Sequence, residues 1–326
     1  MLEGEKESFL KLKDIHSLFV REGIKTDLRR KSQIQKSLLD KNKQYRKQKV
    51  SLKKLFDIED LRNPYPDTRI LYGDRNLEVR RLLVGIDIEI GELLLADQLS
   101  QKGKKIDLVL AHHPEGTALA GLSEVMSLQT DVLKNLGVEP HVADDLMKKR
   151  ITEVSRRLHG GNHMRIVDAA RLLSMPLMCC HTPADNHVAI YLQKLVDRKK
   201  PKSLQYLIDL LLKEPEYREA MKNKAGPKII VGNPTDSAGR TFVDMTGGTE
   251  GSKDIFGRLS QLGIKTLLGM HLSETHFEKV KSEFIQVVLA GHIASDNLGM
   301  NLLLDKLEKT TQLDIVECSG FRRVRR

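Results

Sequence analysis

Short apolar segments alternate with longer amphipathic segments along most of the chain after residue 79. Short apolar runs are typical of buried strands, and the amphipathic segments between them are typical of helices that cover a sheet. This alternation predicts an α/β fold with mixed sheets. We expect the strands 228–233 and 240–245, which a Pro-Thr-Asp-Ser-Ala-Gly turn separates, to form a hairpin. The other predicted strands are 79–88, 105–113, 175–181, 265–270, 285–292 and 313–318.

Three segments depart from this pattern and indicate how the chain is organised. Residues 1–56 lack Pro and are rich in Lys, Gln, Leu and Ser, which predicts helix. Residues 61–74 contain two Pro together with Asp and Gly, which predicts a linker or an ordered loop. The predicted domains are a basic helical N-terminal extension (1–63), a first α/β lobe with a helical insertion at 120–175 (64–200), and a second α/β lobe (201–326).

The positive charge is concentrated in one segment. The chain has 54 Lys and Arg against 44 Asp and Glu, a net charge of +10. Residues 25–54, called the basic arm below, contain twelve of the basic residues and two Asp. The net charge of this arm is therefore +10, which equals the net charge of the whole chain. Such an arm suits contact with nucleic acid, a nucleotide or an acidic partner. Charge runs are more often solvated helix faces, and such a helix would dock here through the apolar side chains of Ile34, Leu38, Leu39, Val50 and Leu52.

Composition argues against several classes of protein. Trp is absent and aromatic residues make up 4% of the chain, so base stacking is not the main mode of recognition. No apolar run approaches the ~18 residues of a membrane span, and the start, MLEGEKESFL, does not resemble a signal peptide. The three Cys provide no disulfide framework. We therefore expect a cytoplasmic protein that makes no membrane contact.

Imidazole and carboxylate groups follow three of the predicted strands. Because ligands bind at the carboxyl ends of strands in α/β sheets, three loops that are distant in sequence could meet at one point. This mixture of nitrogen and oxygen donors suits Zn, Mn or Fe better than Mg, and it predicts a site for two divalent ions. The candidate ligands are His112, His113, His181, Asp185, His292 and Asp296.

Two of these strand ends repeat one pattern, and the repeat strengthens the prediction. The segments that begin at His181 and His292 match at a fixed offset of 111 residues, with Asp four positions after each His. A single Asp at such a position is also typical of a helix N-cap. Adjacent histidines on a strand point to opposite faces, so His112 and His113 would serve two neighbouring ions, provided that the strand ends before Pro114.

Further residues near these strand ends have weaker signals. Glu115 could act as general base on a water held at the metals, or it could be an ordinary surface charge. The Gly-rich segment TGGTEGS (246–252) could bind phosphate or serve as a structural turn. Asp87 could orient a ligand histidine, and Glu274 could reach an adjacent metal.

Three motifs in this order resemble the Nif-three family (NGG-one-interacting factor three), whose members are also labelled GTP cyclohydrolase I type 2 homologues. The motifs are LVGIDI…DLVLAHHP, CCHTPADN and LLGMHLSETHFEKV…VVLAGHIASDN, and the similarity covers roughly 79–116 and 165–326. The resemblance implies a two-lobed α/β fold, a ring-shaped homohexamer built from dimers, and a dinuclear metal centre. Its implied ligands are His112, His113, Asp185, His292 and Asp296, with His181 as a neighbouring partner or extra ligand.

The chain also departs from the family pattern. Asp296 stands where Glu is usual, Glu115 where an apolar residue is usual, and the insertion at 120–175 and the basic arm lack a counterpart. The function implied by the resemblance is metal-dependent hydrolysis of a nucleotide or phosphoester. The alternative is a non-enzymatic metal-binding or regulatory protein whose basic arm contacts nucleic acid or a protein partner.

Overall fold

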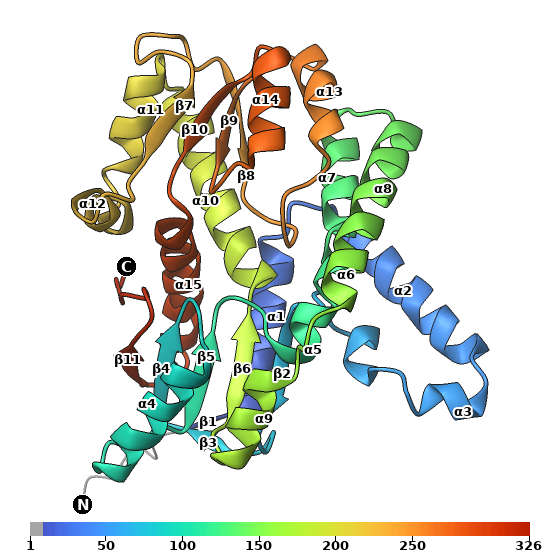
Figure 1. The fold of residues 1–326 in the computed structure, drawn as a ribbon, viewed down its shortest axis with the longest axis vertical. Coiled ribbons are helices and arrows are strands. Elements are labelled where there is room, and N and C mark those ends of the chain that lie inside the picture. Colours follow the sequence, from blue (N-terminus) through green and yellow to red (C-terminus); the bar gives the residue numbers. More distant parts are fainter. Residues whose placement is uncertain (1–8) are drawn as a thin grey trace, which may run out of the picture.

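The computed structural model describes residues 9–326, which form a larger β-sheet in one half of the molecule, a smaller β-sheet in the other half and a short two-stranded sheet of β1 (Leu10–Lys11) and β3 (Glu78–Val79) (Figure 1). The first eight residues, which we predicted as helix, lie outside the described residues. In the larger sheet, only β2 is antiparallel to its neighbour. Its five strands, in spatial order, are β11 (Asp314–Glu317), β4 (Arg81–Gly85), β5 (Leu108–Ala111), β6 (Leu177–Cys180) and β2 (Thr68–Tyr72).

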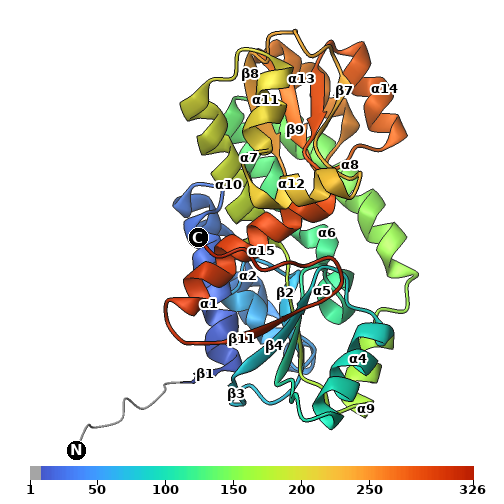
Figure 2. The same cartoon turned by 90° about the vertical axis from the view of Figure 1, so that its left-hand side faces the viewer.

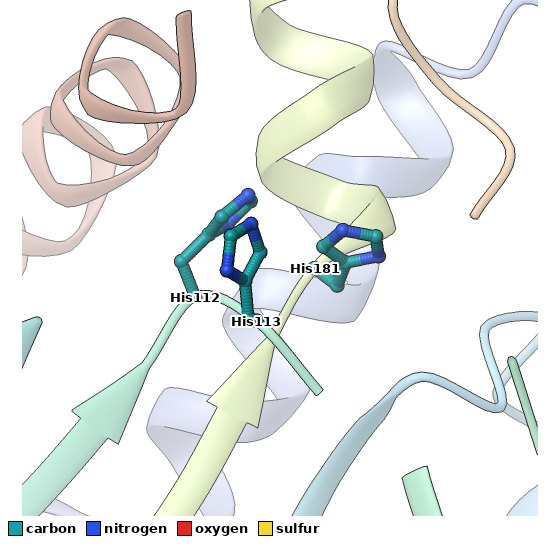
Figure 3. Close-up of side chains that lie close together, drawn as sticks. All are labelled: His112, His113 and His181. Carbon is teal, nitrogen blue, oxygen red and sulfur yellow. The ribbon is translucent and has the colours of Figure 1, made fainter. Parts of the chain in front are cut away.

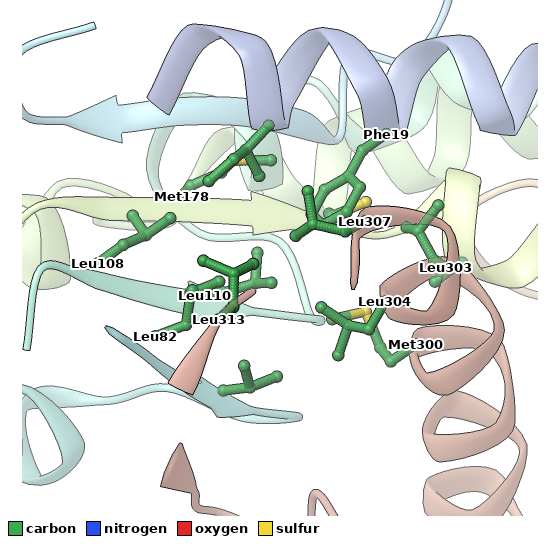
Figure 4. Close-up of a cluster of buried hydrophobic side chains, with 14 of the residues drawn as sticks. Phe19, Leu82, Leu108, Leu110, Met178, Met300, Leu303, Leu304, Leu307 and Leu313 are labelled. Carbon is green, nitrogen blue, oxygen red and sulfur yellow. The ribbon is translucent and has the colours of Figure 1, made fainter. Parts of the chain in front are cut away.

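Both faces of the larger sheet are buried, which explains why its central strands are continuously apolar. Side chains such as Leu82 and Leu110 pack against α1 and α15 on one face (Figure 4). Leu83 and Val109 point to the opposite face, where they pack against α4 and α9. The four covering helices are α1 (Leu12–Lys25), α15 (His292–Glu308), α4 (Ile90–Gln101) and α9 (Arg165–Leu172).

The smaller sheet is also mixed and also covered on both faces. Its strands, in spatial order, are β7 (Lys228–Val231), β10 (Gln286–Leu289), β9 (Ile264–Gly269) and β8 (Arg240–Asp244), and β7 is antiparallel to β10. One face packs against α7 (Ser127–Leu136), α8 (Pro140–His159), α13 (Phe256–Gln261) and α14 (Glu274–Ser282). The other face packs against α10 (Thr182–Lys199), α11 (Leu204–Leu211), α12 (Pro215–Lys222) and the start of α15. The α/β fold with mixed sheets is therefore confirmed.

The predicted hairpin of 228–233 and 240–245 is wrong. Strands β7 and β8 lie at opposite edges of the smaller sheet, where β7 pairs with β10 and β8 pairs with β9. The local turn signal predicted direct pairing, but the apolar strands β9 and β10 occupy the two central positions between them.

Two other strands lie where the sequence did not place them. The predicted linker at 61–74 contains β2, which closes the larger sheet by pairing with β6. The last strand, β11, was assigned to the second lobe at 201–326, yet it pairs with β4 in the larger sheet. The chain therefore returns to its first sheet at its end.

The predicted helical insertion at 120–175 is mostly helical, as expected. Its helices α7 and α8 contribute to the apolar core of the smaller sheet, whereas α9 covers the larger sheet. The insertion therefore contacts both halves of the molecule (Figure 2). The short elements not yet named are η1 (Ile58–Leu61), α5 (Gly116–Ala120), α6 (Leu122–Val125) and η2 (Lys253–Ile255).

The N-terminal extension has two parts with different roles. Helix α1 is part of the core, whereas α2 (Lys31–Lys47) and α3 (Val50–Lys53) extend away from the sheets (Figure 1). Of the apolar residues predicted to dock the arm, Ile34 is buried but Val50 is 76% exposed. The arm therefore docks only in part. Within residues 9–326, none of the helices combines the length and the apolar character that crossing a membrane requires.

Candidate metal centre

The predicted strand ends converge between the two sheets. Strands β5 and β6 each end one residue before a histidine, so His112, His113 and His181 lie together at the carboxyl edge of the larger sheet (Figure 3). His181 is also the N-cap of α10. From the smaller sheet, β10 leads directly into α15, whose first residue is His292.

The carboxylate of Asp296, four residues into α15, faces three of these histidines. Its Oδ1 lies 3.4 Å from Nε2 of His112. Its Oδ2 lies 3.5 Å from Nε2 of His113 and 3.6 Å from Nε2 of His292. The two oxygens thus face different imidazoles, which is the arrangement expected of a carboxylate shared by two cations.

Asp185, in the first turn of α10, supplies the second carboxylate. Its Oδ1 lies 3.5 Å from Nε2 of His112, and its Oδ2 lies 3.7 Å from Nε2 of His181. His112 therefore faces both carboxylates. The structure brings all six candidate ligands into one group, called the His/Asp cluster below: His112, His113, His181, Asp185, His292 and Asp296.

The His/Asp cluster contains buried polar atoms that lack a hydrogen-bond partner among residues 9–326: Nε2 of His112, Oδ1 of Asp185 and both oxygens of Asp296. Such atoms are rare in native proteins, because each costs about 1–3 kcal/mol of stability. The cluster also forms three groups of three residues whose candidate ligand atoms lie within 4.8 Å of one another. Imidazole and carboxylate donors suit Zn, Mn and Fe. The residues therefore fit a bound metal cation.

The N-cap interpretation of the two aspartates is wrong, whereas the condition that the sequence set for the adjacent histidines is met. Asp185 and Asp296 do not act as N-caps, because the caps of α10 and α15 are His181 and Gly291, without a side-chain cap bond. His112 and His113 do not sit on a strand, because β5 ends before them. Their nitrogens fall in a single group with His181, so strand geometry does not keep them apart.

A second set of contacts orients the imidazoles. Nδ1 of His113 lies 2.6 Å from Oδ1 of Asp87, the contact suggested by the sequence. Nδ1 of His181 lies 2.9 Å from Oδ2 of the buried Asp67, which also accepts a hydrogen bond from Thr182. Partners of this kind fix the ring and direct Nε2 toward a metal. Asp67 could not be identified from the sequence, because it lies in the segment predicted as a linker or ordered loop.

Electrostatics in the His/Asp cluster follow from burial and close charges. Burial lowers the pKa of His112 to about 4, so its imidazole is neutral. Burial raises the pKa of Asp185 to about 7. For Asp296 burial acts in the same direction, but His112 and His113 outweigh it and lower the pKa. Burial opposes the charge of His181, yet Asp185 and Asp67 raise its pKa to about 9.

The two glutamates suggested by the sequence lie outside these contacts. Glu115 is the N-cap of α5, and burial beside Glu89 raises its pKa to about 7. Among residues 9–326, the carboxylates of Glu115 and Glu274 make no hydrogen bond or ion pair with the His/Asp cluster. Glu250 is, after Asp67, a second acidic residue that the sequence did not indicate, and its Oε1 accepts a hydrogen bond from the backbone N–H of Ser273 (2.6 Å).

Four residues of the His/Asp cluster line a cleft beside the smaller sheet: His181, Asp185, His292 and Asp296. The cleft is lined by the Gly-rich segment 246–252 and by apolar side chains such as Phe256 and Met270. Nε2 of Gln129 donates hydrogen bonds to the carbonyls of Gly247 and Thr249. The segment leads into the three-residue η2, so its role as a structural turn near the centre fits better than a phosphate-binding helix start.

No family model and no curated protein matches the sequence. Solved structures do match the fold. The NIF3 superfamily protein from Sphaerobacter thermophilus has a TM-score of 0.69 and 28% sequence identity, over 80% of this chain and 94% of that chain. Reduced HcgD from Methanocaldococcus jannaschii has a TM-score of 0.50 and 14% identity, over 82% of this chain and 95% of that chain.

Proposed function

We propose, from the premise that this chain has the fold of the NIF3 superfamily, that it binds divalent metal ions in the His/Asp cluster. The observation that carries the proposal is the set of buried donor atoms without hydrogen-bond partners. Two of these atoms belong to Asp296, whose oxygens face different histidines. This favours two ions over one.

The two ions would have different ligands. His112, Asp185 and Oδ1 of Asp296 would hold one ion, and His113, His292 and Oδ2 of Asp296 would hold the other. His181 would assist the first through its contact with Asp185. When bound, such ions supply Lewis-acid chemistry that polarises a phosphoryl oxygen or a ring carbon and lowers the pKa of water.

For the reaction, we propose metal-dependent hydrolysis of a nucleotide or phosphoester. The cleft beside the His/Asp cluster supports this class, because it gives a substrate access to the metals and has an apolar wall for a base or another flat group. The family resemblance of the sequence supports the substrate class. Glu115 makes no hydrogen bond or ion pair with the His/Asp cluster within the described residues, but its place in the sequence two residues after His113 supports it as the proposed general base, and Glu115→Gln is expected to lower turnover while leaving the metal content unchanged.

A second candidate is a non-enzymatic binding protein that acts through the basic arm. The observation in its favour is that the arm exposes apolar side chains together with its Lys and Arg residues: Leu39, Val50 and Leu52 are all exposed. Deleting the whole extension cannot test this, because Leu12, Ile15 and Phe19 of α1 belong to the core. Charge reversal at Arg46, Lys47 and Lys49, which are exposed, is the suitable change.

The test begins with elemental analysis of protein purified without chelator, followed by a screen of nucleotides and phosphoesters. We expect bound metal in the wild type and its loss in Asp296→Asn. Hydrolysis that disappears in Asp296→Asn and persists in the charge-reversed arm supports the enzyme. Metal binding without any hydrolysis refutes the enzyme and keeps the metal site. A wild type that takes up no metal refutes both the metal site and the metal-dependent enzyme.

A further inference from the structure

A fifth imidazole lies beside the His/Asp cluster. His271 follows β9, and its ring centroid is 4.9 Å from that of His292, with the ring planes at 67°. The ring pairs His112–His113 and His113–His292, whose nitrogens meet in the candidate metal groups, are separated by 5.1 and 5.2 Å. His271 therefore has the same spacing from its neighbour as the histidines inside the cluster.

His271 also has the kind of partner that orients the other imidazoles. Its Nδ1 lies 3.4 Å from Oε1 of Glu250, as Nδ1 of His113 lies close to Asp87. This leaves Nε2 of His271 as the atom available to a metal. The side chain of His271 is 46% exposed and lines the cleft, whereas that of Glu250 is 15% exposed.

Glu250 is held in place from two directions. Its Oε1 accepts a hydrogen bond from the backbone N–H of Ser273 at the start of α14 (2.6 Å). Its backbone carbonyl accepts one from Nε of Arg150 (3.0 Å), which belongs to α8 in the helical insertion. The insertion therefore helps to fix the carboxylate that orients His271.

We propose that His271 is a further metal ligand, which binds the same cation as His113, His292 and Asp296. This inference rests on the metal site of the proposed function. That cation would then have three imidazole nitrogens and one carboxylate oxygen from the protein, a complete set for a four-coordinate ion such as Zn²⁺. The cation at His112 and Asp185 lacks this extra ligand, so the two positions would differ in affinity.

The simplest competing explanation is that His271 only pairs with Glu250. The two explanations differ in what removal of the imidazole does to metal binding. A surface pair of this kind contributes little to stability and nothing to metal affinity. Removing a residue that only orients a ligand lowers metal affinity about tenfold or more. Loss of a ligand itself should therefore weaken binding at one position by at least about tenfold.

Co²⁺ titration of the chelator-treated full-length protein tests the proposal, because the visible absorption of Co²⁺ reports its coordination number. In His271→Ala we expect one binding step to weaken at least about tenfold and the absorption to fall, because additional water ligands raise the coordination number once the imidazole is gone. The second variant, His271→Gln, preserves a polar side chain, and both variants are compared with wild type by thermal melting. An isotherm and spectrum equal to wild type in the folded variants overturn the proposal.

The control is His276→Gln. His276 shares Glu250 with His271, at 3.6 Å, but its ring packs on Phe256 rather than on the cluster. We expect its Co²⁺ binding to match the wild type. An equal loss in His276→Gln would show that a displaced Glu250 loop explains the result and would overturn a ligand role for His271. Wild-type protein that binds no Co²⁺ refutes the proposed function itself, which separates the two failures.

Discussion

Gly299 of α15 packs directly on the backbone of Ala184 in α10. A Cβ atom at position 299 would lie 2.4 Å from the carbonyl oxygen of Ala184 and 2.9 Å from its carbonyl carbon. These are the helices that carry Asp296 and Asp185. The close approach of the two backbones therefore brings both carboxylates of the His/Asp cluster to the same histidine, His112.

We predict that Gly299→Ala destabilises the protein and weakens its metal site. The added methyl group meets backbone rather than a flexible side chain, so α10 and α15 must move apart. Overpacking of this kind costs about 1–3 kcal/mol. Urea unfolding of chelator-treated protein measures the loss of free energy of unfolding, and metal titration measures the loss of affinity.

Gly91→Ala is the matched control for this prediction. Gly91 lies in α4, and a Cβ there would have no neighbour within 4 Å. Since Gly within a helix is less favourable than Ala by about 0.5–1 kcal/mol, this variant should be as stable as the wild type or more stable. Equal unfolding curves for Gly299→Ala and the wild type would contradict the described helix contact.

Removal of metal should lower the stability of the folded protein. The buried oxygens of Asp296 lack partners among residues 9–326, so a bound cation would compensate a cost that the metal-free protein retains. At a free metal concentration of about 100 Kd, binding to the folded state adds about 2.7 kcal/mol. Thermal melting with and without chelator measures the effect. Asp296→Asn should melt at one temperature in both conditions, and a metal-dependent shift in this variant would argue against Asp296 as a ligand.

The sequence predicted the His/Asp cluster well because its signals are local. Each candidate ligand lies at a predicted strand end or four residues beyond one, and the repeat from His181 to His292 indicated that both corners have the same form. The residues that orient the cluster gave no such signal. Asp67 reaches His181 only because β2 pairs with β6, and Glu250 reaches His271 across a loop held by the insertion.

The errors in the predicted fold have the same physical origin. A turn between two apolar segments favours a hairpin, but it contains no information about β9 and β10, which occur later in the chain and take the central positions. The Pro residues at 64 and 66 indicated a loop, although the residues just after them form an edge strand. An edge strand tolerates Pro at or next to it, because the backbone on one side of the strand has no neighbouring strand to hydrogen-bond with.

We predict that the protein becomes less stable as the pH is lowered, because of His16. This residue of α1 is 3% exposed, and Nε2 lies 3.3 Å from the carbonyl oxygen of Thr68. Burial lowers its pKa from the ordinary 6.5, although Glu59 opposes the shift. The unfolded chain therefore binds the proton more readily, so the free energy of unfolding decreases as the pH drops below about 6.5.

His16→Gln isolates this contribution from the other buried histidines. We expect its free energy of unfolding to vary less between about pH 7 and pH 5 than that of the wild type. Urea unfolding of chelator-treated protein at several pH values gives the two slopes. A steeper slope for the variant than for the wild type would contradict a lowered pKa at His16.

The three thiols should differ sharply in reactivity. Cys179 and Cys180 are fully buried in β6, and burial raises the pKa of Cys179 to about 12 and that of Cys180 well above its ordinary value. Because the thiolate is the reactive form, neither should react with a disulfide reagent at neutral pH, and a Cys–His nucleophile beside His181 is disfavoured. Cys318 is partly exposed and should react alone in the folded protein.

Cys318→Ser should therefore abolish labelling until denaturant is added. Labelling of a second thiol in the native protein would contradict this prediction and would mean that β6 opens at its carboxyl end, next to His181. If added metal then prevented this labelling, the opening would lie at the His/Asp cluster.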